Sequence, residues 1–407
     1  MVGLDYMNIL AIETSCDETS LALITADYDT TTNSHRITVH NHITNSQIDI
    51  HRPYGGVFPK LAKREHAHNI IPILVTILET NTSATELVPD YSAKLEHLEN
   101  LLAKEPVVFE MICSSIINLP KPDIDRICVT NGPGLEPALW VGINTAVALG
   151  YLWDIPVVPV NHMEGHILSV MAPVMNNNEK TFTIEMRDYQ YPALALLISG
   201  GHTEIVNVAS IGDYTIIGKT RDDAVGEAFD KVARIVGLPY PGGPEVSNLA
   251  SRYDDTNPYT ITLPRPMIHS GDLDFSFSGL KTAVLYAVRD FYTANNTTEL
   301  PELYKIALCY EFQSAVCEVL ASKITKAIQI YHPAMLVVGG GVSANTQIIQ
   351  TLTNLTEQSP TPIVFKKPSR ELAVDNALMI ALAGYFKIRN NPDALYTDIR
   401  AVGTLSL

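Results

Sequence analysis

The sequence predicts a duplicated α/β fold with two lobes, because two kinds of turn each occur once in either half of its 407 residues. The first kind is a hairpin turn between two apolar, strand-like runs. Residues 8–13 and 20–25 flank a polar turn near the start of the chain, and residues 193–198 and 203–208 flank Ser199-Gly200-Gly201-His202. This repetition indicates that one domain plan is present twice.

The second kind is a glycine-rich turn that leads from a strand into a helix. One strand runs into Asn131-Gly132-Pro133-Gly134 before a predicted helix at 135–153, and another runs into Gly339-Gly340-Gly341 before a helix that we expect to have Ser343 as its N-cap. Glycines at such turns let backbone N–H groups approach an anion at the helix N-terminus. Together the turns follow the plan of the actin, hexokinase and Hsp70 (ASKHA) group, which holds a nucleotide in a central cleft between two lobes. This analogy predicts the fold and leaves the chemistry open.

Because 407 residues exceed what one hydrophobic core usually supports, we divide the chain into lobes. We predict a first lobe at 1–160, a second at 161–370, and a C-terminal helix and tail at 371–407 that return to the first lobe. Two insertions interrupt the first lobe: residues 27–53 alternate like an extended hairpin, and residues 80–122 contain a helical run. We expect the histidines of the earlier insertion to be surface residues rather than ligands; they are His35, His40, His42 and His51.

Composition excludes several classes of protein. The chain has 46% hydrophobic and 18% charged residues, and it contains no apolar run of the ~18 residues needed to span a bilayer. Its first residues enter a strand and carry an acidic group, unlike a signal or transit peptide. The five cysteines show no paired zinc spacing, which favours a reducing cytoplasm.

A net charge of −16 argues against a large nucleic-acid surface, which would require concentrated Lys and Arg. If such an acidic chain acts on a nucleic acid, we expect its binding surface to be small or to be completed by a partner protein. Two local basic clusters are present, and each is ordinarily a solvated helix face. They are Lys60, Lys63 and Arg64 and, near the C-terminus, Lys366, Lys367 and Arg370.

Two imidazoles lie four residues apart in the segment Asn161-His162-Met163-Glu164-Gly165-His166. The segment follows the β-branched run 157–160, which is typical of an interior strand. If a helix begins at His162, His162 and His166 lie on one face about one turn apart, which suits two nitrogen ligands of one divalent metal. The pair alone does not decide between a metal site and coincidence, because the chain has 12 histidines.

Nine motifs follow one another in a fixed order. They are Ile12-Glu13-Thr14-Ser15-Cys16-Asp17-Glu18-Thr19, Asn131-Gly132-Pro133-Gly134-Leu135, His162-Met163-Glu164-Gly165-His166, Ile198-Ser199-Gly200-Gly201-His202-Thr203, Asp222-Asp223-Ala224-Val225-Gly226-Glu227-Ala228-Phe229-Asp230-Lys231, Tyr240-Pro241-Gly242-Gly243-Pro244, Phe275-Ser276-Phe277-Ser278-Gly279-Leu280-Lys281, Gly339-Gly340-Gly341-Val342-Ser343-Ala344-Asn345 and Asp375-Asn376-Ala377. Together they resemble the TsaD family of tRNA threonylcarbamoyltransferases over residues 9–383, apart from the two insertions. The lack of a transit peptide favours the bacterial branch of that family.

The resemblance implies an enzyme that transfers the threonylcarbamoyl group from L-threonylcarbamoyladenylate to N6 of adenosine 37, just 3′ of the anticodon, in tRNAs that read A-starting codons, with release of AMP. It implies one divalent metal per subunit, with iron favoured over zinc, and His162, His166 and Asp375 as its ligands. Two histidines and a carboxylate leave coordination positions open. The residues implied to bind the adenylate are Leu197, Ile198, Ser199, Gly200, Gly201, Asp230, Gly243 and Asn345.

The implied roles agree with the chemistry of the residues. The amides of Ser199-Gly200-Gly201 can face a phosphate, Asp230 can accept a hydrogen bond from a ribose hydroxyl, and Gly243 leaves room for an adenine ring. Two departures from the family pattern affect affinity: Ser247 replaces an Asp that many members carry, and Ala373-Val374 replaces the more usual small polar pair.

The group that accepts the N6 proton stays open between Asp17, Glu18 and solvent. Three other functions share part of the pattern. An ASKHA-type small-molecule kinase would share the glycine turns without needing three metal ligands, and a non-catalytic nucleotide-binding partner would be expected to lose these ligands. A metalloprotease-like protein would carry His-Glu-x-x-His, whereas Glu164 lies within His-x-Glu-x-His.

By family analogy we expect a cytoplasmic heterodimer with a TsaB-type paralogue. We also expect a TsaE-type ATPase as helper, tRNA as substrate, and no membrane.

Overall fold

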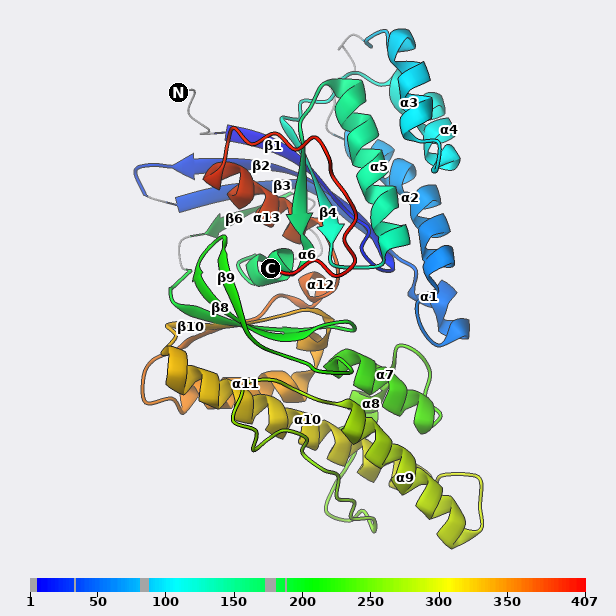
Figure 1. Cartoon of the computed structure of the whole chain (residues 1–407), viewed down its shortest axis with the longest axis vertical. Helices are drawn as coiled ribbons and strands as arrows, with labels where there is room; N and C mark the ends of the chain where they lie inside the picture. Colours follow the sequence, from blue (N-terminus) through cyan, green and yellow to red (C-terminus); the bar gives the residue numbers. More distant parts are fainter. Residues whose placement is uncertain (1–5, 33, 81–87, 173–180, 187–188) are drawn as a thin grey trace. The chain divides into compact units, whose positions relative to one another are not determined.

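The computed structural model describes residues 6–32, 34–80, 88–172, 181–186 and 189–407, which belong to two compact units. Unit 1 comprises Met1–Asp49, Val57–Tyr189 and Val374–Leu407, and unit 2 comprises Ile50–Gly56 and Gln190–Ala373. Each unit contains one mixed β-sheet (Figure 1). The division differs from the predicted boundary at 160, because the helix that follows this point packs against the C-terminal helix within unit 1.

Unit 1 is built around a six-stranded sheet in the order β5-β4-β1-β2-β3-β6. The predicted hairpin is confirmed, since β1 pairs antiparallel with β2, and β1 also pairs parallel with β4. The expectation of an interior strand at 157–160 is wrong: β5 lies at the edge of the sheet, a position that suits Pro159, which has no backbone N–H to donate. The strands are β1 (Tyr6–Glu13), β2 (Glu18–Asp29), β3 (Ser34–Ser46), β4 (Arg126–Gly132), β5 (Val157–Asn161) and β6 (Phe182–Met186).

The segment at 27–53 forms the predicted hairpin, but it is part of the sheet rather than an addition to it, because β3 lies between β2 and β6. The expectation that its histidines are surface residues is also wrong: His51 is buried, and His35, His40 and His42 are half-buried. The ring of His35 packs against Tyr28 and Phe386, with centroids 4.9 and 4.8 Å apart.

Helices cover both faces of this sheet. α2 and α5 pack on one face and form a core with Leu10, Ile12 and Leu21, whereas α13 packs on the other face against β1, β2 and β5 (Figure 1). Within the described part of the segment at 80–122, the predicted helical elaboration is confirmed, since α3 and α4 pack on α5 and α2. The helical elements of this region are α1 (Ile48–His51), α2 (Pro59–Glu79), η2 (Ser92–Lys94), α3 (Leu95–Leu101), α4 (Pro106–Ser115), η3 (Ile116–Asn118), α5 (Glu136–Trp153), α6 (His162–Ser169) and α13 (Ala377–Asn390).

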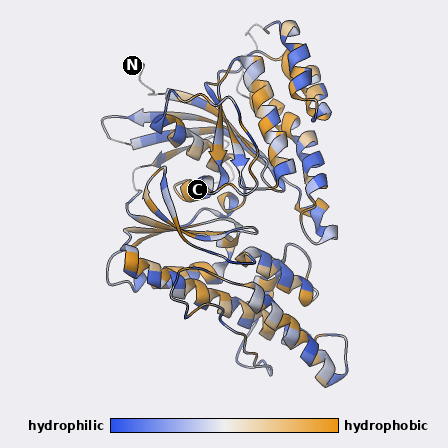
Figure 2. Ribbon diagram, in the orientation of Figure 1, coloured by the Kyte–Doolittle hydropathy of each residue, from blue (hydrophilic) through white to orange (hydrophobic). Residues whose placement is uncertain are grey.

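Unit 2 has a five-stranded sheet in the order β11-β10-β7-β8-β9, and its predicted hairpin is β7 with β8. The apolar side of the sheet packs on α7, α8 and α10, and Phe229 meets Phe312 edge to face at 4.9 Å. Hydrophilic and hydrophobic residues alternate along α9 and α10, as expected for helices with one buried face (Figure 2). The elements are β7 (Ala193–Ile198), β8 (Thr203–Ser210), β9 (Asp213–Lys219), β10 (Met335–Gly339), β11 (Val364–Lys366), η1 (Arg52–Tyr54), α7 (Val225–Ile235), α8 (Gly242–Ala250), α9 (Ser278–Asn295), α10 (Glu302–Tyr331), η4 (Gly341–Ala344), α11 (Thr346–Glu357) and α12 (Arg370–Ala373).

Two further features concern the cysteines and the hydrophobicity of the helices. All five cysteines are free thiols. In the portion of the chain that the structure describes, no helix combines the length and apolar character needed to cross a membrane.

Candidate functional site

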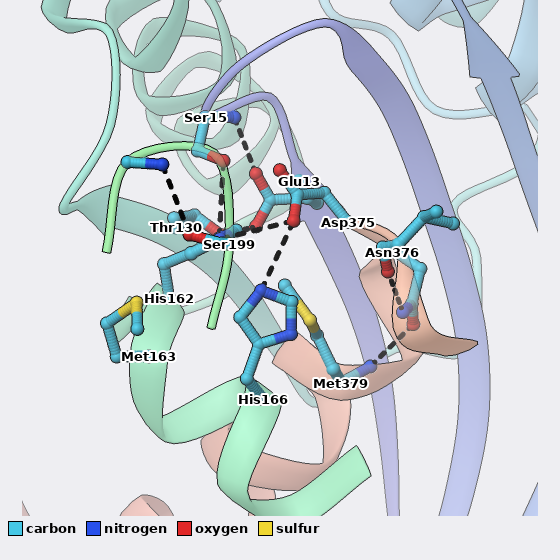
Figure 3. A network of polar contacts seen from close by, with 12 residues as sticks. Glu13, Ser15, Thr130, His162, Met163, His166, Ser199, Asp375, Asn376 and Met379 are labelled. Atoms are coloured by element: carbon cyan, nitrogen blue, oxygen red, sulfur yellow. Dashed lines mark hydrogen bonds and ion pairs between the residues drawn. The ribbon is translucent and has the colours of Figure 1, made fainter. Parts of the chain in front are cut away.

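The paired histidines and Asp375 come together within unit 1. The side chain of Asn161 accepts hydrogen bonds from the N–H groups of Met163 and Glu164, so α6 begins at His162 as predicted. His166 follows one turn later, and the two imidazole centroids are 4.7 Å apart. Oδ1 of Asp375 lies 3.3 Å from Nε2 of His162 and 3.2 Å from Nε2 of His166 (Figure 3).

The backbone around Asp375 is held by its neighbour Asn376, the N-cap of α13. The Asn376 side chain accepts a hydrogen bond from Met379 N–H, and the N–H of the residue after it donates to Ser20 Oγ on β2. Gly165 lies between the two histidines, where a Cβ atom would be 3.0 Å from Met379 Cγ. A larger residue would therefore push α6 away from α13, and glycine at this position keeps the histidines close to Asp375.

The three side chains fit the metal that the family resemblance implies. Their ligand atoms lie within 4.8 Å of one another, and no other group of three His, Cys, Asp or Glu among the described residues is this compact. His166 is fully buried, and while its Nε2 lies against Asp375, its Nδ1 makes no hydrogen bond to the part of the protein that is described. Such a group is costly to bury unless a ligand completes it. Two imidazoles and one carboxylate are a suitable donor set for a first-row divalent metal.

The charges of the three groups depend on one another. Burial lowers the pKa of His166. Burial also acts to lower the pKa of His162, but the carboxylates of Asp375 and Glu13 outweigh it, so the net shift of this pKa is upward. Burial acts to raise the pKa of Asp375, but the imidazoles of His162 and His166 outweigh it and hold this pKa below its usual range. A bound metal ion would compete with protons for the same imidazole nitrogens.

Glu13 belongs to this cluster, although it is not among the residues to which a role is assigned from the sequence. It is the last residue of β1, and its side chain is fully buried. Its Oε2 lies 3.1 Å from Nδ1 of His162 and accepts a hydrogen bond from Thr130 Oγ1 at 2.6 Å (Figure 3). A carboxylate at the end of an otherwise apolar strand was the available signal, because buried acids require partners.

The turn between β1 and β2 carries the two candidate bases, Asp17 and Glu18, both only 7% exposed. Burial raises the pKa of Glu18 well above its usual range, and the nearby Asp17 and Asp375 raise it further. The turn is fixed to α2 by His66, whose Nε2 lies 3.0 Å from the carbonyl oxygen of Cys16. The structure thus places both carboxyl groups in unit 1, with Glu18 close enough to Asp375 for their charges to interact.

The residues implied to bind the adenylate lie in unit 2. Leu197 and Ile198 are the last residues of β7, and both are buried. The end of β7 lies close to the glycine turn after β10, since a Cβ on Gly340 would be 2.5 Å from Ile198 O. Within the first turn, Ser199 N–H donates to the carbonyl of His202, and Gly201 N–H donates to Ser199 Oγ. Two of the three amides predicted to face a phosphate are therefore used by the turn itself.

Of the other three residues implied to bind the adenylate, Asp230 and Asn345 have hydrogen-bond partners within the protein, and Gly243 adjoins open space. Oδ1 of Asp230 accepts a hydrogen bond from Gly242 N–H at 2.7 Å. Asn345 is the N-cap of α11, and its amide donates to Gln313 at 2.9 Å. The expectation that Ser343 is the N-cap is wrong, because the chain first forms the short 3₁₀ helix η4. At Gly243 a Cβ would meet no described atom within 4 Å, which is consistent with space for a flat ligand.

Comparison with known protein families gives one match that spans both units. The model of the family described as TsaD, tRNA N6-adenosine threonylcarbamoyltransferase, matches residues 38–88 and 87–382. Proteins of that name are similar over nearly their whole length. The one from Neisseria gonorrhoeae is 38% identical, covering 98% of this chain and 99% of the relative. The one from Burkholderia ambifaria is 39% identical, covering 96% and 95%.

Solved structures support the predicted fold class. Full-length HypF in a phosphate- and nucleotide-bound form superposes with a TM-score of 0.50 at 12% sequence identity. The superposition covers 96% of this chain and 47% of HypF. At this identity the likeness concerns the fold alone, and it agrees with the duplicated two-lobed α/β plan of the ASKHA group.

Proposed function

Because the chain belongs to the TsaD family of tRNA N6-adenosine threonylcarbamoyltransferases, we propose that it transfers a threonylcarbamoyl group from L-threonylcarbamoyladenylate to N6 of adenosine 37 in tRNAs that read A-starting codons, releasing AMP. The observation that carries the proposal is the match with relatives of this name over nearly the full length of both chains. A small-molecule kinase or a metalloprotease is disfavoured by the same match.

We propose that His162, His166 and Asp375 hold one divalent metal, with iron favoured and zinc as the alternative. The compact arrangement of their ligand atoms and the buried imidazole of His166 support this proposal. When bound, such a metal supplies a Lewis acid that polarises an oxygen of the substrate.

The acyl donor is an activated mixed anhydride, so the chain has to bind it, orient it and accept one proton. For binding we propose the eight residues of unit 2 named above, with Asp230 and the turn at Ser199-Gly200-Gly201 closest to the nucleotide. Orientation of a reactive group near its nucleophile is itself a large part of catalysis. For the proton of N6 we propose Asp17 or Glu18; burial together with the nearby Asp17 and Asp375 raises the pKa of Glu18, which makes its ionised carboxylate a stronger base.

Incubation with threonylcarbamoyladenylate and unmodified tRNA, followed by mass analysis of the nucleosides, tests the proposed reaction. We expect modified adenosine only when the donor, the tRNA and the chain are all present. Reactions with and without a TsaB-type paralogue and a TsaE-type ATPase test whether partners are required. Absence of modified adenosine with both partners present and intact metal content would contradict the proposed function.

We also propose that the chain works in the cytoplasm as a heterodimer with the TsaB-type paralogue. The net charge of −16 supports a need for partners in binding tRNA, and the five free thiols are consistent with a reducing compartment. Sedimentation of the chain with and without the purified paralogue tests the heterodimer.

A further inference from the structure

The carboxyl group of Glu13 is surrounded by hydrogen-bond donors. Its Oε1 accepts from Ser15 N–H at 2.5 Å, and its Oε2 accepts from Thr130 Oγ1 at 2.6 Å and lies 3.1 Å from His162 Nδ1 (Figure 3). The side chain is fully buried, so water does not substitute for these contacts. An ionised carboxyl can accept from all three groups at once, whereas an amide cannot.

His162 must present one particular nitrogen to the rest of the cluster. Its Nε2 lies 3.3 Å from Asp375 Oδ1, so Nδ1 is the atom that remains for Glu13. A neutral ring with its hydrogen on Nδ1 donates to Glu13 and leaves the Nε2 lone pair available to a metal ion. The opposite tautomer carries its hydrogen on Nε2, the nitrogen that has to bind the metal. Ser15 Oγ, 3.2 Å from the same Nδ1, is the rival acceptor.

We propose that Glu13 is a positioning residue of the metal centre, which fixes His162 in the tautomer whose Nε2 lone pair is available to the metal. Carboxylates that accept from the second nitrogen of a metal-bound imidazole fix the orientation of the ring and strengthen its binding. The same carboxyl holds the N–H of Ser15, so it joins the His162 ring to the turn that carries Asp17 and Glu18. This inference rests on the proposed metal centre but not on the identity of the substrate.

The variant Glu13→Gln changes the chemistry with almost no change in size. Because Ser15 N–H can only donate, the amide oxygen of Gln turns toward it, and the NH₂ group then faces His162 Nδ1. His162 has to accept through Nδ1 and carry its hydrogen on Nε2. We expect cobalt(II) binding to the full-length, metal-free protein to weaken about 10- to 100-fold.

Two controls separate positioning from a general structural role. Glu105→Gln alters another buried carboxyl of unit 1, which pairs with Lys63 at 2.8 Å, and it should leave cobalt affinity unchanged. Ser15→Ala removes the rival acceptor and should also leave it unchanged. Equal cobalt affinity in Glu13→Gln and wild type, or an equally large loss in Ser15→Ala, would overturn the proposal.

A spectroscopic measurement on the wild-type protein decides the case if Glu13→Gln does not fold. In the zinc-loaded protein labelled with ¹⁵N-histidine, we expect His162 to bind zinc through Nε2 and to retain its hydrogen on Nδ1. Zinc bound through Nδ1 would show that Glu13 has no such role. Because neither experiment contains tRNA or adenylate, both remain informative if the transfer assay fails, whereas a wild-type chain that binds no cobalt or zinc would contradict the metal centre itself.

Discussion

Asp375 connects the two histidines at the scale of single residues, since one of its oxygens lies within 3.3 Å of a nitrogen of each. Asp375→Asn keeps the shape of the side chain but removes the charged ligand. We expect bound metal to fall by more than the ~10-fold that even outer contacts of a metal site typically cost, with the circular dichroism spectrum unchanged. Elemental analysis of the purified variant measures this, with the exposed Asp398→Asn as control. Wild-type metal content in Asp375→Asn would exclude the residue as a ligand.

Gly200, in the turn after β7, and Gly226, in α7 against that turn, give opposite predictions. A Cβ on Gly200 meets no described atom within 4 Å, whereas a Cβ on Gly226 would lie 2.6 Å from Ser199 O. Gly200→Val should therefore fold normally and weaken adenylate binding by obstructing the ligand. Gly226→Ala should lower the free energy of unfolding by about 1–3 kcal/mol through overpacking. Urea unfolding together with calorimetric titration of a non-hydrolysable adenylate checks both. Unchanged adenylate affinity in Gly200→Val would show that the turn does not contact the ligand.

At the scale of elements, the packing of β3 against α13 predicts a pH dependence of stability. Burial, with the positive charge of Arg389, lowers the pKa of His35 from 6.5 to about 4. Between these values the unfolded chain takes up a proton that the folded chain does not, so the free energy of unfolding decreases as the pH falls through this window. His35→Phe keeps the ring contacts with Tyr28 and Phe386 and removes this uptake. Its unfolding free energy should thus depend less on pH than that of wild type, as measured by urea titration on either side of the window. Equal pH dependence in the two proteins would contradict a neutral, half-buried His35.

Elements defined by local patterns could be predicted from the sequence, and those defined by distant partners could not. Both hairpins follow from periodicity, and the start of α6 at His162 is fixed by the neighbouring side chain of Asn161. The apolar run at 157–160 indicates a strand, but not that β5 is an edge strand in which alternate residues are buried. Ser343 is the predicted cap of the helix after the second glycine turn, but the cap is Asn345, which also contacts Gln313 on the distant α10.

The candidate site shows the same limit. His162, His166 and Asp375 were reached through a family resemblance, since spacing alone pairs the histidines but does not identify a carboxylate far along the chain. Glu13 could not be assigned, because its role depends on three contacts from β4, α6 and the turn after β1. The role of Glu13 can be recognised only in the folded structure, where these elements lie together.

At the scale of the whole molecule, a net charge of −16 leaves few places where tRNA phosphates could bind. At the start of α2, the cluster of Lys60, Lys63 and Arg64 offers fewer unpaired basic side chains than the sequence indicates. Lys63 pairs with the buried Glu105 at 2.8 Å, and the exposed Arg64 pairs with its half-buried neighbour Glu65 at 3.0 Å. Lys63 therefore has a structural task, and replacing it would leave a buried carboxyl without its ion-pair partner.

The double variant Lys60→Ala/Arg64→Ala consequently tests tRNA docking better than a variant that also removes Lys63. Each lost phosphate contact lowers the slope of log affinity against log salt by about 0.7–0.9. If both side chains contact tRNA, the slope should fall by about twice that amount, while metal content and adenylate binding stay at wild-type levels. Lys63→Ala is the matched control: it should reduce the free energy of unfolding and leave the salt slope unchanged. The slopes are measured by tRNA binding over a range of salt concentrations with the partner proteins present. An unchanged slope in the double variant would place the tRNA surface elsewhere, with Lys366, Lys367 and Arg370 of unit 2 as the next residues to replace.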